Sequence, residues 1–143
     1  MTDYQQKAVN NLNRIRTATE SIRQKELEVE ALRYKASGAG AIRYDKDHVQ
    51  TSPQNYLEMA VADLIELEAE LEEDKASMED MLTNAYRIVR RMPEQEQRIL
   101  IEWYYINGLK VEEVCNKINK SERSFYYLRD DALEAYGKIL LKN

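Results

Sequence analysis

The sequence contains few of the residues that build disulfide-linked, zinc-binding or β-sheet domains. Its 143 residues include one cysteine and one histidine, which excludes an intramolecular disulfide and a four-ligand Cys/His zinc site. Four glycines and two prolines leave too little turn chemistry for a sheet of many short strands. We therefore expect an all-α chain whose stability comes from packing, with no metal and no cofactor.

Positive charge and long apolar runs are also scarce. The chain has 21 Lys plus Arg against 26 Asp plus Glu, a net charge of −5, so a globally basic nucleic-acid-binding protein is excluded and any basic patch must be local. No apolar run approaches the ~20 residues that a membrane-spanning helix needs, and the polar start lacks a signal-peptide core. We expect a cytoplasmic protein of a bacterial cell or phage host, without membrane contact.

A seven-residue repeat dominates the first part of the chain. No Gly or Pro precedes Gly38, which predicts one long helix over residues 4–36. A coiled-coil helix contacts its partner through two positions of each heptad, which together form its seam. The second of these positions is less apolar here, since it includes Asn11 and Lys25. The apolar residues of the first position are Ala8, Ile15, Ile22, Val29 and Ala36.

A second long helix is predicted over residues 53–91, after a loop at 37–52. Ser52 before Pro53 is a typical helix start. Only Asp74 interrupts the apolar seam, and because Lys25 interrupts the other one, we expect these two residues to face each other in an antiparallel coiled-coil hairpin. The seam residues are Leu57, Leu64, Leu71, Met78, Ala85 and Met92 at one position and Ala60, Leu67, Met81 and Ile88 at the other.

The second helix carries a strongly acidic stretch. Residues 58–80 contain ten Asp or Glu and one Lys, a charge of 1 − 10 = −9. This stretch should repel DNA. Two interpretations stay open: a solvated coiled-coil face, which is the commoner case, and a specific docking surface.

The last part of the chain changes pattern at Pro93, which ends or sharply bends the long helix. Three shorter helices are predicted over residues 94–106, 111–118 and 121–140. Gly108 fits a left-handed cap that closes the first of them, and Ser121 fits an N-cap that opens the last. We expect two domains, a coiled-coil hairpin at 1–91 and a helix-turn-helix unit at 92–143.

The last two helices have apolar faces that can bury a shared core. These faces comprise Val111, Val114, Cys115 and Ile118 on one helix, and Phe125, Leu128, Ala132, Tyr136 and Ile139 on the next. We interpret Cys115 as a core residue, because no second cysteine or neighbouring histidine suggests a nucleophile. The opposite face of the last helix presents Arg123, Ser124, Tyr126, Tyr127, Asp130 and Glu134.

The residues from 92 onward resemble region four of bacterial sigma factors. The resemblance covers about 50 residues, and with its long coiled extension the whole chain is similar to the sigma-like regulators of Gram-positive phages and prophages, near the ArpU type of late transcription regulator. The matching residues are Met92-Pro93-Glu94, Ile99-Leu100, Trp103-Tyr104, Gly108, Val111-Glu112-Glu113-Val114-Cys115, Ile118, Ser121, Phe125, Leu128 and Ala132-Leu133.

The helix-turn-helix pattern implies DNA recognition by the start of the last helix. We expect Arg123 to contact a guanine edge or a phosphate, with Lys117 and Lys120 as backbone anchors. The other predicted contacts are Ser124, Tyr126, Tyr127 and Arg129. Residues 92–143 carry eight Lys or Arg and nine Asp or Glu, a net −1, so non-specific affinity should be weak.

Catalytic motifs are missing from the sequence. His48 lies in a polar loop without a carboxylate or cysteine at ligand spacing, and no glycine-rich phosphate loop of the G-x-x-x-x-G-K type occurs. We predict that the protein is not an enzyme.

Two functions of different class fit this sequence. The first is a transcription regulator that reads a promoter or operator in double-stranded DNA, while its coiled coil binds another copy or the host RNA polymerase. The second is an adaptor without a DNA role, which docks on polymerase or another phage or host protein. Either protein should form a dimer through apolar positions that lie off the seam, namely Val61, Ile65, Tyr86 and Val89.

Overall fold

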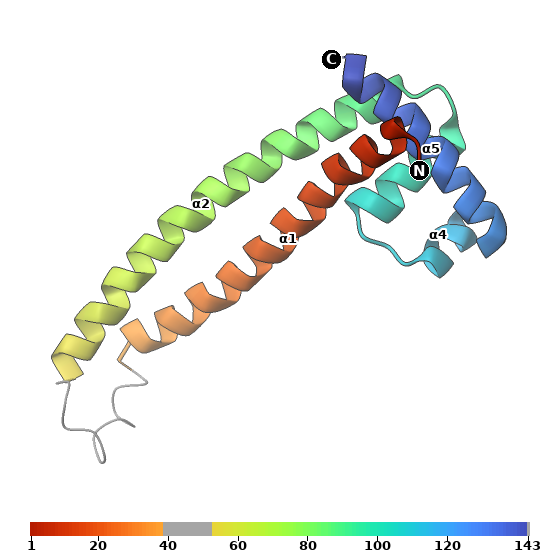
Figure 1. Cartoon of the computed structure of the whole chain (residues 1–143). Coiled ribbons are helices and arrows are strands. Elements are labelled where there is room, and N and C mark those ends of the chain that lie inside the picture. Colours follow the sequence, from red (N-terminus) through yellow and green to blue (C-terminus); the bar gives the residue numbers. More distant parts are fainter. Residues whose placement is uncertain (39–52, 143) are drawn as a thin grey trace. The chain divides into compact units, whose positions relative to one another are not determined.

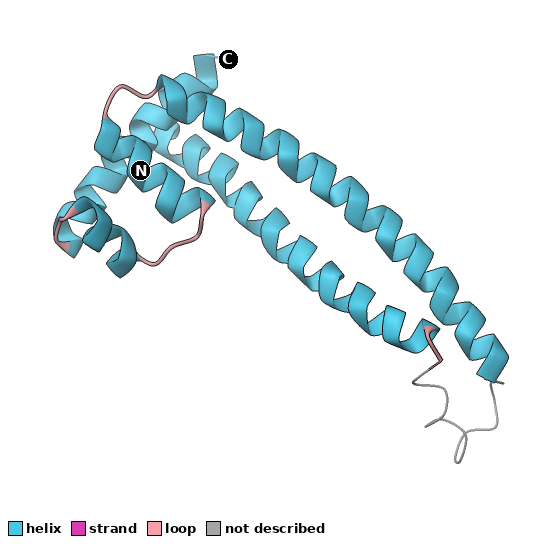
Figure 2. Ribbon diagram, turned by 180° about the vertical axis from the view of Figure 1, so that it is seen from behind, coloured by secondary structure: helices cyan, strands magenta, loops and turns pink. Residues whose placement is uncertain are grey.

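The computed structural model describes residues 1–38 and 53–142, and within these ranges every regular element is a helix (Figures 1 and 2). The all-α class is therefore confirmed. Most of the predicted loop, with His48 and the cap residue Ser52, lies outside the described residues. Among the described helices, none is both long and apolar enough to cross a bilayer.

The two long helices begin and end where the heptad repeats predict. Helix α1 spans Asp3–Ala36 and helix α2 spans Pro53–Arg91. Pro93 ends α2 as expected, and the Arg98 guanidinium donates hydrogen bonds to the carbonyls of Met92 (2.5 Å) and Pro93 (3.2 Å) just beyond the helix. These bonds satisfy acceptors that a helix end leaves free.

The chain forms two compact units, residues 19–77 and residues 1–18 with 78–143. In the first unit α1 and α2 run antiparallel, because ion-pair partners shift in opposite directions along the two helices: Glu26 pairs with Lys75 and Arg33 pairs with Glu68. The buried side chains of this unit, Ile22, Val29, Ala60 and Leu71, are all predicted seam residues.

The second unit joins the ends of both long helices to the shorter helices. Its core contains Ala8, Leu12 and Ile15 from α1, Ala85 and Ile88 from α2, and Met92 just after α2, each at most 1% exposed. Our expectation that residues 92–143 form a domain of their own stays a prediction. Within the structure, these residues share a single core with both long helices.

The first of the shorter helices has two different halves. Helix α3 (Gln95–Leu100) continues directly into the π-helix η2 (Ile101–Ile106), where the Asn107 amide donates to the Glu102 carbonyl five residues earlier. The sequence predicted one α-helix here, because an apolar pattern does not reveal a wider turn. Gly108 follows with φ +73°, which confirms the predicted left-handed cap.

Helices α4 (Val111–Ile118) and α5 (Glu122–Lys142) complete this unit. Leu100, Ile101 and Tyr105 belong to the same core as Val114 and Phe125. Helices α3 and η2 thus share a core with α4 and α5, and the candidate site lies on the latter two helices.

Candidate nucleic-acid interface

A tight turn joins α4 to α5. Asn119 adopts the left-handed conformation (φ 55°, ψ 50°), and the Lys120 amide donates to the Cys115 carbonyl at 3.0 Å. The Ser121 hydroxyl then accepts a hydrogen bond from the Ser124 amide at 3.1 Å, which confirms the predicted N-cap. The left-handed Asn119 was not predicted, although asparagine is among the residues that tolerate this conformation best.

The inner faces of α4 and α5 share a core, as predicted. Val114 and Phe125 are fully buried, and the Phe125 ring meets the Tyr104 ring edge-on with centroids 5.2 Å apart. Cys115 is half-buried against this core. Burial and the nearby carboxylates of Glu122 and Glu112 raise the pKa of its thiol, which favours the neutral, unreactive form.

The start of α5 presents an exposed outer face. Arg123 and Ser124 are exposed, and the side chains of Tyr126 and Tyr127 are 40% and 64% exposed. Within the described part of the chain, Arg123 has no ion-pair or hydrogen-bond partner. Its guanidinium is therefore available to an external anion or base edge. The Ser124 hydroxyl lies 3.1 Å from the Ser121 hydroxyl.

The other predicted DNA-contacting cations already have partners. Lys117 lies over the Trp103 ring at 4.2 Å, and Lys120 forms an ion pair with Glu96 at 3.4 Å. Arg129 donates to the Asp130 carboxylate at 2.9 Å and its guanidinium lies 5.1 Å from the Tyr126 ring centre. Contacts with phosphate would have to compete with these interactions.

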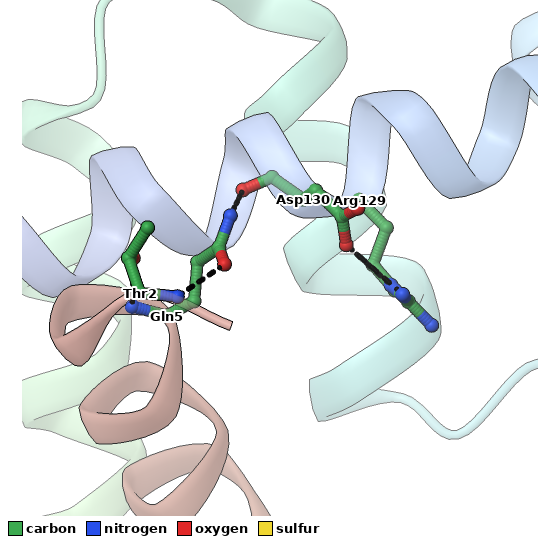
Figure 3. Close-up of polar contacts among 4 residues, drawn as sticks. All are labelled: Thr2, Gln5, Arg129 and Asp130. Atoms are coloured by element: carbon green, nitrogen blue, oxygen red, sulfur yellow. Dashed lines mark hydrogen bonds and ion pairs between the residues drawn. The ribbon is translucent and has the colours of Figure 1, made fainter.

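The exposed outer face of α5 extends over fewer residues than the sequence predicted. The Gln5 side-chain amide donates to the Asp130 carbonyl at 3.0 Å, and the Thr2 hydroxyl donates to the Glu134 carboxylate at 2.5 Å (Figure 3 shows the Gln5 contact). Asp130 is bound by Gln5 through its backbone carbonyl only, and its side chain stays 46% exposed. Glu134 is half-buried with its carboxylate bound by Thr2, so its placement on a free outer face was wrong. The reason is that the start of α1 packs across α5.

A close backbone approach fixes this packing. Gly137 is buried, and a Cβ atom at this position would come within 2.7 Å of the Tyr4 carbonyl carbon. The hydroxyl of the preceding residue, Tyr136, donates to the Asn11 side-chain oxygen at 2.7 Å. A glycine and a buried tyrosine within a helix were the available sequence signals, but the sequence does not identify the partner helix.

One residue of the predicted dimer surface is also misplaced. Val89 is 5% exposed and belongs to the core, so it is unavailable for association. Tyr86 is half-buried, while Val61 and Ile65 are 41% and 65% exposed. Of the four residues predicted to form a dimer surface, only Val61 and Ile65 are exposed.

A family model described as "Protein of unknown function (DUF1492)" matches residues 40–136, more than half of the chain. The chain belongs to the DUF1492 family. The match takes in α2, all of α4 and most of α5, so the candidate interface lies inside the DUF1492 region, whereas α1 precedes it. No curated protein and no solved structure matches the chain.

Proposed function

We propose that this DUF1492 protein is a transcription regulator of phage or prophage type that binds promoter or operator DNA through α4 and α5. The observation that carries the proposal is the exposed, unpartnered Arg123 at the start of α5, directly after a tight turn from α4. A helix-turn-helix uses this part of its second helix to contact base edges in the major groove. The resemblance to sigma region four favours the same residues.

The proposed DNA contacts are few. Since Lys117, Lys120 and Arg129 have intramolecular partners, Arg123 is the cation best placed to contribute a new charge-assisted contact. Tyr126 and Tyr127 offer ring faces and hydroxyls to sugar-phosphate or thymine methyl groups. Because most cations of the candidate interface are already paired, DNA binding should be weak and detectable mainly at low salt. Host RNA polymerase is the partner that would strengthen this binding.

The test is selection of a cognate duplex from a randomised library, followed by anisotropy titrations at several salt concentrations. Arg123→Ala should cost about 1–3 kcal/mol on the selected site and relax preference at one base pair. Lys117→Ala should weaken all sequences alike and reduce the salt slope. Lys142→Ala, which removes the same charge at the far end of α5, is the matched control and should leave site preference unchanged.

The second candidate function is docking to another protein. It is favoured because Tyr127 is exposed while the nearby cation Arg129 is already paired with Asp130. Exposed tyrosines with little surrounding free charge are typical of protein interfaces. If Arg123→Ala and Tyr126→Ala leave DNA binding unchanged but abolish association with polymerase, the adaptor function replaces the regulator.

We also propose that the protein acts as a dimer. The exposed Val61 and Ile65 lie on α2 and are large apolar side chains that a second copy would cover. Light scattering should return twice the chain mass of 16.8 kDa, and Ile65→Glu should return the monomer mass.

A further inference from the structure

A groove lies between α1 and α2 in the unit formed by residues 19–77. Its volume is about 440 Å³, and the half-buried side chains of Leu32 and Leu67 line it. Three exposed carboxylates, those of Glu28, Asp63 and Glu66, also line the groove. The groove therefore combines apolar and acidic surface.

The two sides of this hairpin differ in how their charges are satisfied. On one side, cross-helix ion pairs join Arg33 to Glu68 (3.6 Å) and Lys75 to Glu26 (3.9 Å). Each helix contributes two of these residues seven positions apart, which places them along one edge of the seam. Charges on this side are neutralised within the chain.

The groove lies along the opposite edge of the same seam. Along this edge, Glu28 and Lys35 lie seven residues apart on α1, and Asp63 and Glu70 lie seven residues apart on α2. Glu70 lies 3.7 Å from Lys25, a cation that it shares with Asp74. Glu28, Asp63 and Glu66 have no ion-pair partner in the described ranges 1–38 and 53–142. The groove lining holds one cation of its own, Lys35, against four carboxylates, so this side carries excess negative charge next to partly exposed leucines.

We propose that this groove binds a cationic amphipathic helix of a partner protein. Its apolar residues would contact Leu32 and Leu67, and its Lys or Arg residues would pair with Glu28, Asp63 and Glu66. The carboxylates repel nucleic acid and anionic lipid, whose phosphates carry the same sign of charge. None of the residues that line the groove is buried, so nothing in it resembles the buried polar groups that orient a small ligand.

The experiment uses the full chain and a labelled synthetic helix of leucine and lysine with all leucines on one face. A scrambled peptide of the same composition has the same charge without an apolar face. The groove variant is Glu28→Gln, Asp63→Asn and Glu66→Gln combined. The matched control, Glu30→Gln with Glu58→Gln and Glu72→Gln, removes equal charge from exposed residues of the same two helices that do not line the groove.

We expect the amphipathic peptide to bind the wild-type chain and the control variant alike, and to lose about five- to tenfold in affinity on the groove variant. The scrambled peptide should bind all three proteins weakly. Equal loss in both variants, or equal binding of both peptides, would show mere attraction between opposite net charges and overturn the proposal. Conversion of a dimer to a monomer by the groove variant alone would also overturn it, because a second copy would then occupy the groove. None of these outcomes depends on whether α5 binds DNA.

Discussion

The Lys25 ammonium donates a hydrogen bond to the Asp74 carboxylate at 2.6 Å, joining the charged residue in the seam of α1 to the charged residue in the seam of α2. Glu70 contributes a second carboxylate 3.7 Å from the same nitrogen. The hydrogen bond to Asp74 raises the pKa of Lys25 above its ordinary value, although burial opposes the shift. A single polar pair within an apolar seam can fix the register of a coiled coil, because any shift would leave both groups without partners.

A double-mutant cycle tests this register function. Lys25→Leu leaves Asp74 facing an apolar partner, and Asp74→Leu leaves Lys25 with only the longer contact to Glu70, whereas the double variant places leucine at both positions. We therefore expect the free energies of unfolding measured in urea to be non-additive, with the double variant more stable than the two single effects predict. Additive effects would show that the two side chains do not depend on each other.

The same pair predicts a response to alkaline pH. Because the folded-state pKa of Lys25 is raised, its contribution to stability is present below the ordinary value of 10.5 and is lost as the pH rises above it. The urea midpoint of the wild-type chain should therefore fall more above this pH than that of the double leucine variant. Parallel pH profiles for the two proteins would contradict the prediction.

Tyr136 gives a second pH prediction. Burial raises the pKa of its hydroxyl well above the ordinary value of 10.0, so stability is lost as the pH rises above about 10, where the unfolded chain ionises first. Tyr136→Phe should cost about 1 kcal/mol at neutral pH, because the hydrogen bond to Asn11 is lost. The variant should be less sensitive than the wild type to alkaline pH in urea titrations. A constant difference at all pH values would refute this account.

Gly137→Ala should destabilise the protein, although alanine favours a helix by about 1 kcal/mol. The added methyl group would meet the Tyr4 backbone, which cannot move without displacing the start of α1, and overpacking of this kind costs about 1–3 kcal/mol. Urea unfolding followed by circular dichroism measures the difference. Asp131→Ala, at an exposed position of the same helix, is the control and should not destabilise. A stabilised Gly137→Ala variant would mean that α1 does not pack on α5 as described.

Phe125→Ala separates the core of the candidate interface from its surface. Phe125 is 0% exposed, so truncation should cost about 3–5 kcal/mol and abolish both DNA and protein binding by unfolding the helices around it. Tyr127→Ala changes a neighbouring aromatic residue that is 64% exposed and should leave thermal unfolding unchanged. A folded Phe125→Ala protein with normal stability would show that α4 and α5 do not share this core.

Local sequence patterns were sufficient for the helices and for much of the candidate interface. The Pro93 stop, the Gly108 cap and the Ser121 cap depend on interactions within a few residues, so each could be predicted. The inner face of α5 was predicted for a similar reason, because residues three and four positions apart share a helix face. The partners of Lys117, Lys120 and Arg129 were not predicted. Two of these contacts reach back to α3 and η2, and short-range spacing carries no information about them.

By itself, the sequence determined an all-helical protein with two long heptad helices and a polar pair at matching places in their seams. Those features follow from periodicity, which each helix expresses along its own length. Only the tertiary structure decided that the start of α1 covers Asp130 and Glu134, that Val89 is buried, and that residues 101–106 form a π-helix. The π-helix is defined by backbone hydrogen bonds that an apolar pattern does not reveal. The other two depend on which surfaces meet, across distances of up to 132 residues along the chain, and packing between such surfaces is set by shape and burial that no local pattern records.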